Sequence, residues 1–452
     1  MLNHFPPSNA VLRARLAATG IGYAGIDGAW WLPATAPFPL PAATRDALPR
    51  IGRALFALFD TLAELYACDE TLRATLTHRV APGLPWIVGG EPVLMLRPDF
   101  QLVPDGAGYR PVATELEVCP AAQGFAHAMQ VGYGLTTDLA DGFARLLRGR
   151  TLLIVGTAQW SEFLFEQLAF CRALAERGAS AYVLYDRPVA AIAADVAAGR
   201  RWVPPLFGVA VRPPGWDGDV LGRLAARGLD AFLWPGEAWP ERVGDAVVFR
   251  FGYFDCFDAA AIRAFVRWQA AGATFLNPLI TYLESKSVLV AARLPAVRER
   301  LGSQPDVLAT LDRCLPETLL LTPATLPALL DEREEWVIKF AGFDGDNRAW
   351  GGRSLRFGGD GTVDEWRSAL YEAVELPWPV VAQRLVPSAR LDLDYNDARG
   401  TAARLTGGHT RLRTFLLRDA GNVLAAGSHL TFSARAAVSE ATDAVQAPVV
   451  WV

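Results

Sequence analysis

The sequence has 452 residues, of which 52% are hydrophobic and 20% are charged. This length and composition predict an ordered chain of roughly two to four packed units and exclude extended disorder. With 43 basic and 48 acidic residues the net charge is −5, so no basic field favours a nucleic-acid partner. Because no apolar run is long enough for a membrane span and no targeting segment is recognised, we expect a soluble, cytoplasmic protein.

Cysteine and histidine spacing argues against two common kinds of site. The five cysteines contain no C-x-x-C pair, so neither a disulfide framework nor a cysteine-rich zinc site is predicted. The five histidines show no H-E-x-x-H spacing, which leaves a zinc hydrolase without support. Metal catalysis based on histidine is therefore unsupported by the sequence.

Lysine is unusually scarce in this chain. Of the 43 basic residues, only Lys286 and Lys339 are lysines, and the other 41 are arginines. An ammonium group and a planar guanidinium are not interchangeable at a tight phosphate site, so a chain rich in arginine can retain lysine where a compact charge is needed. The alternative is that both lysines are chance survivors.

The first part of the chain combines helices with a strand pair. Apolar residues recur at three and four over 44–76, which predicts amphipathic helices. The runs PVLMLRPDF and PVATELEV then predict two strands joined by the turn VPDGAGYR. On a strand, Glu115 and Glu117 project to the same face, where they meet either solvent or a cation.

Strand-like and helix-like runs alternate between residues 150 and 277, which is typical of a parallel α/β unit. Expected strands are TLLIVG, ASAYVLYD, LDAFLWPG, AVVFRFGYF and ATFLNP. The first strand ends in GTAQW, which lacks the G-x-G-x-x-G pattern of a dinucleotide site. This unit is therefore expected to bind a non-nucleotide substrate.

A strand, WVIKF, carries Lys339 and leads directly into the glycine-rich stretch AGFDGDNRAWGGRS. Glycines let backbone N–H groups approach phosphate oxygens, lysine supplies a positive charge, and Asp or Asn oxygens can hold Mg²⁺. The stretch fits neither the P-loop pattern nor the kinase pattern, in which the glycine loop precedes the lysine. An ordinary surface loop is the alternative.

Four segments together resemble the ATP-grasp ligases, in the circularly permuted branch that contains eukaryotic-type glutathione synthetase and glutathionylspermidine synthetase. LRPDF with ELEVCPAAQGF resembles the family's Arg-Asp strand and its metal-binding E-x-N strand, and VVFRFGYF resembles its R-x-G-Y substrate strand. NPLITYLESKSVL resembles the N-P…K helix, and WVIKFAGFDGDNRAWGG aligns with the family's lysine strand and glycine loop.

The resemblance implies the residues of a site for ATP, Mg²⁺ and substrates. For ATP it implies Lys286, Lys339, Gly342, Gly345, Gln383, Arg384 and Leu385. For Mg²⁺ it implies Glu117, Asp105, Asp344 and Asn347, for catalysis Arg97 and Arg250, and for substrate Asp99 and Tyr253. Two positions depart from the family pattern, since Cys119 stands where the family has a metal-binding Asn and Phe343 where it has a Glu.

The predicted fold class is mixed α/β and α+β: a circularly permuted ATP-grasp with an inserted Rossmann-like parallel α/β substrate domain. The predicted divisions are an N-terminal helical region (1–90), the metal-binding strands (91–149), the substrate domain (150–277) and the nucleotide-binding part (278–452) with its loop at 341–352. The resemblance implies a ligase that joins a small-molecule carboxylate to an amine.

Two other hypotheses remain open. Because of Cys119 and Phe343, the protein could be a catalytically impaired relative that binds a nucleotide or metabolite without turnover. The other hypothesis is a two-domain α/β enzyme, such as a transferase, that does not depend on ATP. The substrates are unspecified, no membrane partner is expected, and a homodimer is left open.

Overall fold

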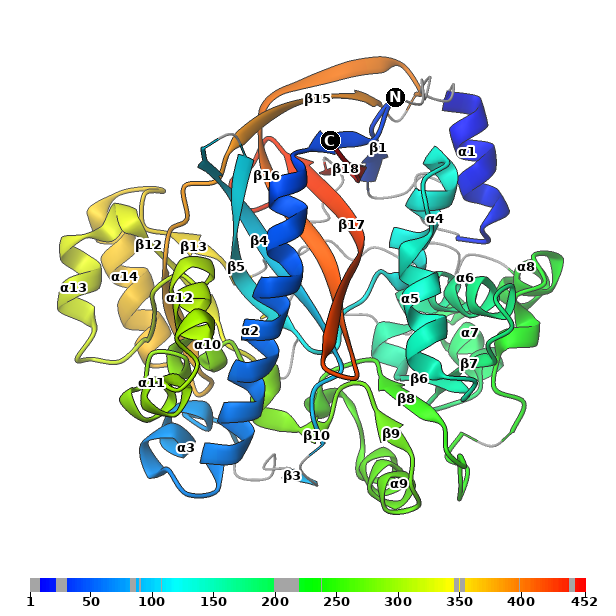
Figure 1. Ribbon diagram of the computed structural model, residues 1–452, viewed down its shortest axis with the longest axis horizontal. Coiled ribbons are helices and arrows are strands. Elements are labelled where there is room, and N and C mark those ends of the chain that lie inside the picture. Colours follow the sequence, from blue (N-terminus) through cyan, green and yellow to red (C-terminus); the bar gives the residue numbers. More distant parts are fainter. Residues whose placement is uncertain are drawn as a thin grey trace.

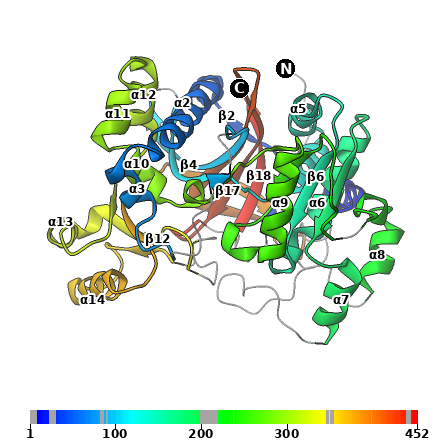
Figure 2. The ribbon, with the colours of Figure 1, turned by 90° about the horizontal axis from the view of Figure 1, so that it is seen from below.

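The computed structural model describes residues 9–21, 31–81, 87–88, 91–106, 108–198, 219–236, 238–344, 349, 354–397, 399–438 and 444–452. They form a mixed α/β fold with three main sheets (Figure 1). The mixed α/β class predicted from the sequence is thus confirmed. Seen from below, a small sheet and a parallel sheet lie on opposite sides of a large central sheet (Figure 2).

The large sheet brings together strands from both ends of the chain. Its order is β1 (Trp31–Pro33), β18 (Ala444–Trp451), β17 (Asn422–Ser433), β16 (Ala402–Asp419), β4 (Met95–Asp105) and β5 (Gly108–Glu117). In addition, β15 (Arg390–Asn396) pairs with β16, and β2 (Phe38–Leu40) pairs with β18. The N-terminal region is thus hydrogen-bonded to the last strand of the chain.

Helix α2 (Ala42–Tyr66) covers the apolar face of this sheet (Figure 1). Its residues Leu48, Ile51, Leu55, Leu58 and Leu62 recur at helical spacing and are all buried. They join one core cluster with side chains from the strands, among them Leu96, Phe100, Leu412, Leu430 and Phe432. Because side chains alternate along a strand, the intervening residues of β4 and β16 point to the opposite, polar face. The helix expected over 44–76 is confirmed as α2 followed by α3 (Glu70–Leu76).

The small sheet is antiparallel and carries Lys339. Its order is β11 (Thr318–Leu320), β14 (Val380–Arg384), β12 (Trp336–Phe340) and β13 (Arg356–Phe357). Trp336 and Ile338 pack with α13 (Leu326–Asp331) and α14 (Val363–Val374), so Val337 and Lys339 face the other way. Helix α14 begins at a capping box in which Thr362 and Glu365 bond each other's backbone N–H groups.

The parallel sheet has the order β7 (Ala181–Tyr185), β6 (Leu152–Gly156), β8 (Val247–Arg250) and β9 (Thr274–Phe275). It confirms parallel pairing within 150–277, whereas the status of this region as an inserted substrate domain stays a prediction, as does the circular permutation. The strand expected for LDAFLWPG is wrong. Asp230–Phe232 form a 3₁₀ turn, and the pairing is limited to a bridge between Leu233 and Val183, in which the backbone N–H of Trp234 donates to the Val183 oxygen. Pro235 comes next and has no backbone N–H with which to continue the ladder.

The remaining elements surround these sheets. The other helices are α1 (Asn9–Ala18), α4 (Gln123–Tyr133), α5 (Asp138–Leu147), α6 (Leu164–Ala175), α7 (Val189–Ala197), α8 (Val220–Ala226), α9 (Ala259–Ala270), α10 (Ser287–Ala291), α11 (Pro295–Leu301) and α12 (Pro305–Cys314). The 3₁₀ segments are η1 (Ala158–Phe163), η3 (Asp230–Phe232), η4 (Phe254–Cys256), η5 (Thr281–Glu284) and η6 (Arg333–Glu335), and β3 (Ile87–Val88) pairs with β10 (Leu279–Ile280).

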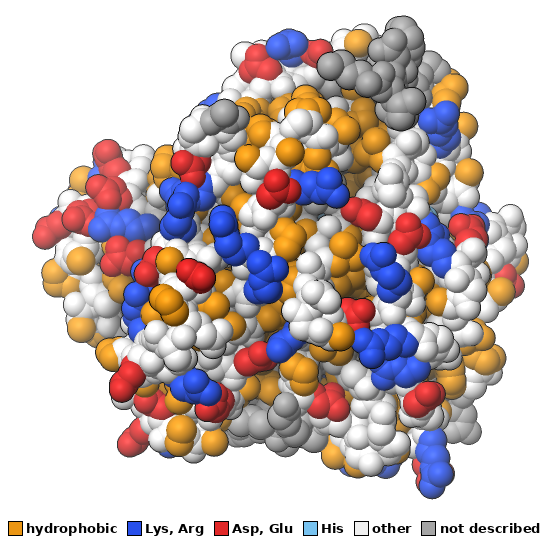
Figure 3. All heavy atoms as spheres, in the orientation of Figure 1, with side chains coloured by type: hydrophobic (Ala, Val, Ile, Leu, Met, Phe, Trp, Pro, Cys, Tyr) orange, Lys and Arg blue, Asp and Glu red, His pale blue; other side chains and the backbone are white. Residues whose placement is uncertain are grey.

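Acidic and basic side chains are interspersed on the face of the molecule that α2 crosses (Figure 3). Exposed ion pairs of the protein include Arg300–Glu64 and Arg313–Asp105. Among the described residues, no helix combines the length and the apolar character that a bilayer span requires.

Candidate functional site

Both lysines of the chain line one cavity of about 430 Å³ between the small sheet and the large sheet. Lys339 reaches it from β12, and its Nζ donates to the backbone oxygen of Thr114 at 2.7 Å and to Gln383 Oε1 at 2.9 Å. Burial, together with the charge of nearby Lys286, lowers the pKa of Lys339 to about 8. The ammonium group is thus held in place while it faces a cavity.

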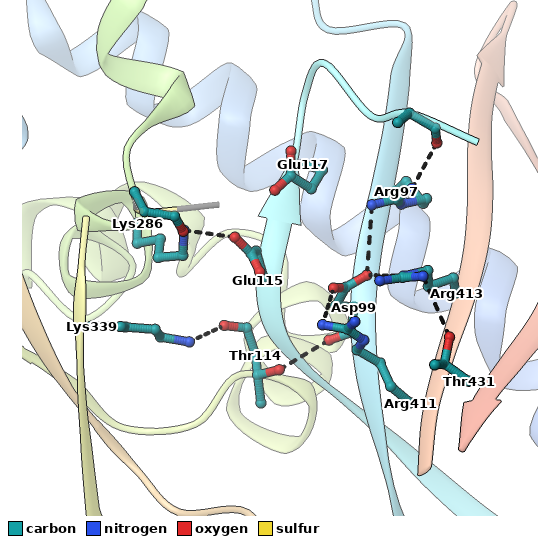
Figure 4. Close-up of polar contacts among 12 residues, drawn as sticks. Arg97, Asp99, Thr114, Glu115, Glu117, Lys286, Lys339, Arg411, Arg413 and Thr431 are labelled. Atoms are coloured by element: carbon teal, nitrogen blue, oxygen red, sulfur yellow. Dashed lines mark hydrogen bonds and ion pairs between the residues drawn. The ribbon is translucent and has the colours of Figure 1, made fainter. Parts of the chain in front are cut away.

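Lys286 enters the cavity from the segment just before α10. Its Nζ lies 2.6 Å from Glu115 Oε1 and donates to the backbone oxygen of Ala349 at 2.7 Å (Figure 4). Burial alone would lower the pKa of Lys286, but the carboxylates of Glu115 and Glu117 outweigh this effect and raise it. Lys286 is therefore a fixed positive charge.

The predicted strand pair is confirmed as the antiparallel hairpin β4–β5, and its register places four charged residues together. Arg97 lies opposite Glu117, and Asp99 lies opposite Glu115. All four therefore share the polar face (Figure 4). The Tyr253 hydroxyl lies 3.2 and 3.1 Å from the two oxygens of Glu117 and donates to that carboxyl group.

The carboxyl group of Glu117 has an unusually high pKa. Burial and the neighbouring Glu115 raise its pKa to about 8, while Lys286 and Arg97 act in the opposite direction. In Glu115 the attraction of Lys286 outweighs the effect of burial and lowers the pKa. The two glutamates thus differ. Glu115 is ion-paired with Lys286, whereas Glu117 would lose its proton more readily if a further cation were bound beside it.

This difference predicts a pH dependence of stability in the ligand-free protein. A carboxyl group whose pKa is higher in the folded chain binds its proton more tightly there, so the stabilisation is present at low pH and is lost as pH rises. For Glu117 the window runs from the usual value of 4.5 to about 8. We expect the free energy of unfolding to fall more steeply across this window in the wild type than in Glu117→Gln.

Urea unfolding measured at several pH values tests this prediction. Glu241→Gln is the control, because Glu241 is exposed and its replacement should leave the wild-type slope unchanged. Glu166 and Glu284 also have pKa values raised to about 7 by burial, so the comparison between variants, not the wild-type slope alone, isolates Glu117. Parallel curves for Glu117→Gln and the wild type would contradict the assignment.

Asp99 lies at the centre of three arginines. Arg411 Nη1 is 3.0 Å from Oδ2, Arg413 Nε is 3.2 Å from Oδ1, and Arg97 Nη2 is 3.9 Å from Oδ1. Burial would raise the pKa of Asp99, but Arg411, Arg413 and Arg97 outweigh it and hold the pKa well below its usual range. Asp99, expected to contact substrate, therefore contacts arginines of the protein itself.

The predicted catalytic residue Arg250 is fully buried. It forms an ion pair with Glu284, donates to the backbone oxygen of Gly252, and lies with its guanidinium carbon 4.1 Å from the centre of the Phe254 ring. Its backbone exchanges hydrogen bonds with the side chain of Asn277. Arg250 thus braces the end of β8 near Tyr253 rather than pointing into the cavity.

Three residues predicted to bind the nucleotide, at the end of β14 and just after it, lie along one edge of the cavity. Gln383 is buried, accepts from Lys339, and donates to Thr318 Oγ1 at 3.2 Å. Arg384 forms ion pairs with Glu317, Glu332 and Glu335. Leu385 is 45% exposed and its backbone N–H donates to Glu335.

The glycine-rich stretch is described in part. Gly342 adopts a φ of 149°, and Phe343 a φ of 58°, so the backbone bends sharply before Asp344. Asp344 is buried and accepts from the backbone N–H of Ala349 at 2.8 Å. Gly345 and Asn347, which were predicted to bind ATP and Mg²⁺, lie outside the described residues.

Asp105, predicted as a metal ligand, is not brought to Glu117. It lies at the tip of the hairpin opposite Gly108 and pairs with Arg313 at 2.8 Å. The eight residue steps from Arg97 to Asp105 span about 27 Å of strand. The turn expected at VPDGAGYR is much shorter than predicted, because β4 runs to Asp105 and β5 starts at Gly108. A larger cavity of about 610 Å³ at this tip is lined by Asp105 but by neither lysine.

The donors on the polar face fit Mg²⁺ delivered together with a phosphate ligand. Among the described residues no three His, Cys, Asp or Glu side chains form a metal-binding group. Mg²⁺ is usually held by one or two carboxylates plus substrate phosphates, so Glu117 beside Glu115 suffices for such a site. Cys119 is buried and its pKa is raised well above the usual value by burial and by Glu284, which leaves a neutral thiol unsuited to Mg²⁺.

Two residues of this face were missed by sequence reasoning. Arg411 and Arg413 alternate along β16 and meet Asp99, which lies opposite Arg413 in register. The alternating pattern RLRT was a signal for them, but two arginines among 41 carry little weight.

Comparison with known proteins identifies a similar fold. No protein-family model matches the sequence, and no curated protein matches it. Among solved structures, a glutathione synthetase like-effector from Globodera pallida in its apo form shares 12% identity, with a TM-score of 0.53 over 100% of this chain and 99% of that chain. A candidate gamma-glutamylcysteine synthetase from Methylobacillus flagellatus KT shares 10% identity, with a TM-score of 0.37 over 85% and 83% of the two chains, which is too low to support an argument. The chain therefore shares its overall fold with a glutathione synthetase-like protein.

Proposed function

We propose that this protein is an ATP-dependent ligase of the permuted ATP-grasp type that joins a small-molecule carboxylate to an amine. The observation that carries the proposal is the convergence of both lysines of the chain on one cavity, from segments far apart in the sequence. If the two lysines had been retained by chance, nothing would be expected to bring them to the same cavity. The fold shared with a glutathione synthetase-like protein supports the same function.

In the first step, an oxygen of the substrate carboxylate attacks the γ-phosphorus of ATP. The bond from that phosphorus to the bridging oxygen breaks, ADP leaves, and an acyl phosphate remains. Lys286 and Lys339, whose side chains are buried where they line the cavity, neutralise the phosphate charge. Bound Mg²⁺, held by Glu117 beside Glu115, would supply further charge neutralisation at the phosphate oxygens.

In the second step, the amine nitrogen attacks the acyl carbon. The bond from carbon to the phosphate oxygen breaks, an amide forms, and inorganic phosphate leaves with the proton that the amine releases. No enzyme nucleophile is needed, because the protein acts by positioning and electrostatics. We propose that Arg97, which lies opposite Glu117 in the hairpin, binds the reacting carboxylate. Arg250, which is ion-paired with Glu284, acts as a positioning residue that holds the end of β8 near Tyr253.

ADP release by the purified protein, with Mg²⁺, ATP and pooled amino acids, dipeptides and polyamines, tests this function. Mass spectrometry of the products then identifies the condensation. We expect substrate-dependent ADP together with a product whose mass is the sum of two substrates minus water. ADP formation without any condensation product would contradict a ligase.

A second candidate function is nucleotide binding without turnover. Cys119 favours it, because a buried neutral thiol occupies the position of the family's metal-binding Asn. This candidate predicts that ATP raises the melting temperature while no pool stimulates ADP release. A transferase without ATP dependence predicts no effect of ATP on melting.

A further inference from the structure

The wall of the cavity that lies across from the lysines carries two arginines and a histidine. Arg390 on β15 and His409 on β16 are partners in register, and Arg411 follows two residues along β16 on the same side. All three line the cavity that Lys286 and Lys339 line. Figure 4 shows the lysines and Arg411 approaching the hairpin β4–β5 from opposite sides.

Asp99 determines where the Arg411 guanidinium lies. Asp99 Oδ2 is 3.0 Å from Arg411 Nη1, while Oδ1 of the same carboxylate is engaged by Arg413. Arg413 also donates to Thr431 Oγ1 at 3.4 Å. Because Asp99 is itself buried between β5 and β16, it fixes Arg411 on this wall of the cavity.

Three cations from three separate elements are thus crowded around one cavity. Burial is the main cause of the lowered pKa of Lys339; Lys286 and Arg411 lower it further, while Glu115 and Asp99 act in the opposite direction. A polyphosphate placed between the three cations would be attracted by all of them. A guanidinium adds two parallel N–H donors that match phosphate oxygens, which an ammonium group does not provide.

The geometry points to Arg411 as a third cationic ligand of the ATP polyphosphate, with Asp99 as its positioning residue. This inference rests on the proposed function and adds a residue that lies outside every motif of the family resemblance. Lys286 and Lys339 bind the phosphates from one wall, and Arg411 binds them from the opposite one.

Equilibrium binding of ATP with Mg²⁺ to the full chain tests this inference. We expect Arg411→Gln to raise the Kd for ATP by about tenfold or more, because the substitution removes a charge-assisted hydrogen bond to the phosphates. Arg411→Lys keeps the positive charge but loses the two parallel N–H donors of the guanidinium. Its Kd for ATP should therefore lie between those of Arg411→Gln and the wild type. Arg404→Gln is the matched control, because Arg404 lies on the same strand but is exposed and pairs with Asp392 and Asp394.

The role of Asp99 has its own readout. If Asp99 acts through Arg411, adding Asp99→Asn to Arg411→Gln should weaken ATP binding little further, whereas two independent effects would multiply. Because Asp99 is buried on three arginines, the single Asp99→Asn variant can fail to fold, and Arg411→Gln then carries the test alone.

The outcomes separate this inference from the proposed function. Wild-type affinity in Arg411→Gln would overturn the inference and leave the ligase intact. A raised KM for the carboxylate substrate with an unchanged Kd for ATP would also overturn it, since Arg411 would then serve the substrate. If the wild type itself fails to bind ATP, the proposed function falls and this inference with it.

Discussion

Replacing Lys339 with Met is expected to reduce the rate of ADP formation at least about a hundredfold. The Lys339 side chain is buried and its ammonium group lines the cavity, where one preorganised cation or donor is typically worth that much in rate. Methionine keeps the length of the side chain but removes the charge. The affinity for ATP should fall as well, because the ground-state phosphates carry charge before any bond changes.

A control is needed because Lys339 also donates to Thr114 and Gln383 inside the fold. Leaving these acceptors without a donor costs about 1–3 kcal/mol of stability, which the melting temperature reports. Arg367→Met is the matched control, since Arg367 is an exposed cation on α14, beside the same small sheet, and pairs with Asp364. A folded Lys339→Met protein with wild-type turnover would rule out the assignment.

Replacing Glu117 with Gln is expected to abolish Mg²⁺-dependent ADP formation without weakening the ligand-free fold. The pKa of Glu117 is raised to about 8, so the side chain is largely protonated near neutral pH without a cation, and Gln imitates that neutral form. The variant should still accept the hydrogen bond from Tyr253. What it lacks is a carboxylate for Mg²⁺, which binds hard anionic oxygen.

Three measurements distinguish this effect from a general loss of structure. The melting temperature of Glu117→Gln should match or exceed that of the wild type at neutral pH. ATP binding without Mg²⁺ should be unchanged, whereas the gain in affinity that Mg²⁺ gives the wild type should be lost. Glu241→Gln should behave as the wild type in all three. Full Mg²⁺ dependence in Glu117→Gln would exclude Glu117 as the metal ligand.

Much of the local structure could be predicted from the sequence because it depends on short-range periodicity. The period of two along β5 places Glu115 and Glu117 on one face, and the helical repeat of α2 identifies the residues that pack on the large sheet. The alternation in WVIKF likewise separates Lys339 from Trp336 and Ile338, which face the helices.

The errors arose where tertiary pairing overrides local signals. Asp105 is twelve residues before Glu117, yet the strands continue almost to the tip of the hairpin and place it at the far end. Strand β18 was not predicted, and it contains Pro448. That residue lies between the stretches of β18 that pair with β1 and with β2, so its missing N–H interrupts neither set of pairs.

The convergence of the lysines could not be derived from spacing either. Lys286 precedes a short helix, Lys339 lies in a strand, and only the arrangement of the two sheets brings both to one cavity. The family resemblance suggested their common role, whereas Arg411 belongs to no motif and was found only in the structure.

If the proposed function is correct, ATP binds between the two lysines. A crystal structure of the protein with Mg²⁺ and a non-hydrolysable ATP analogue shows whether it does. We expect the polyphosphate between Lys286 and Lys339, with the base at the edge formed by Gln383 and Leu385. A nucleotide bound elsewhere, or a cavity without nucleotide at saturating analogue, would contradict it.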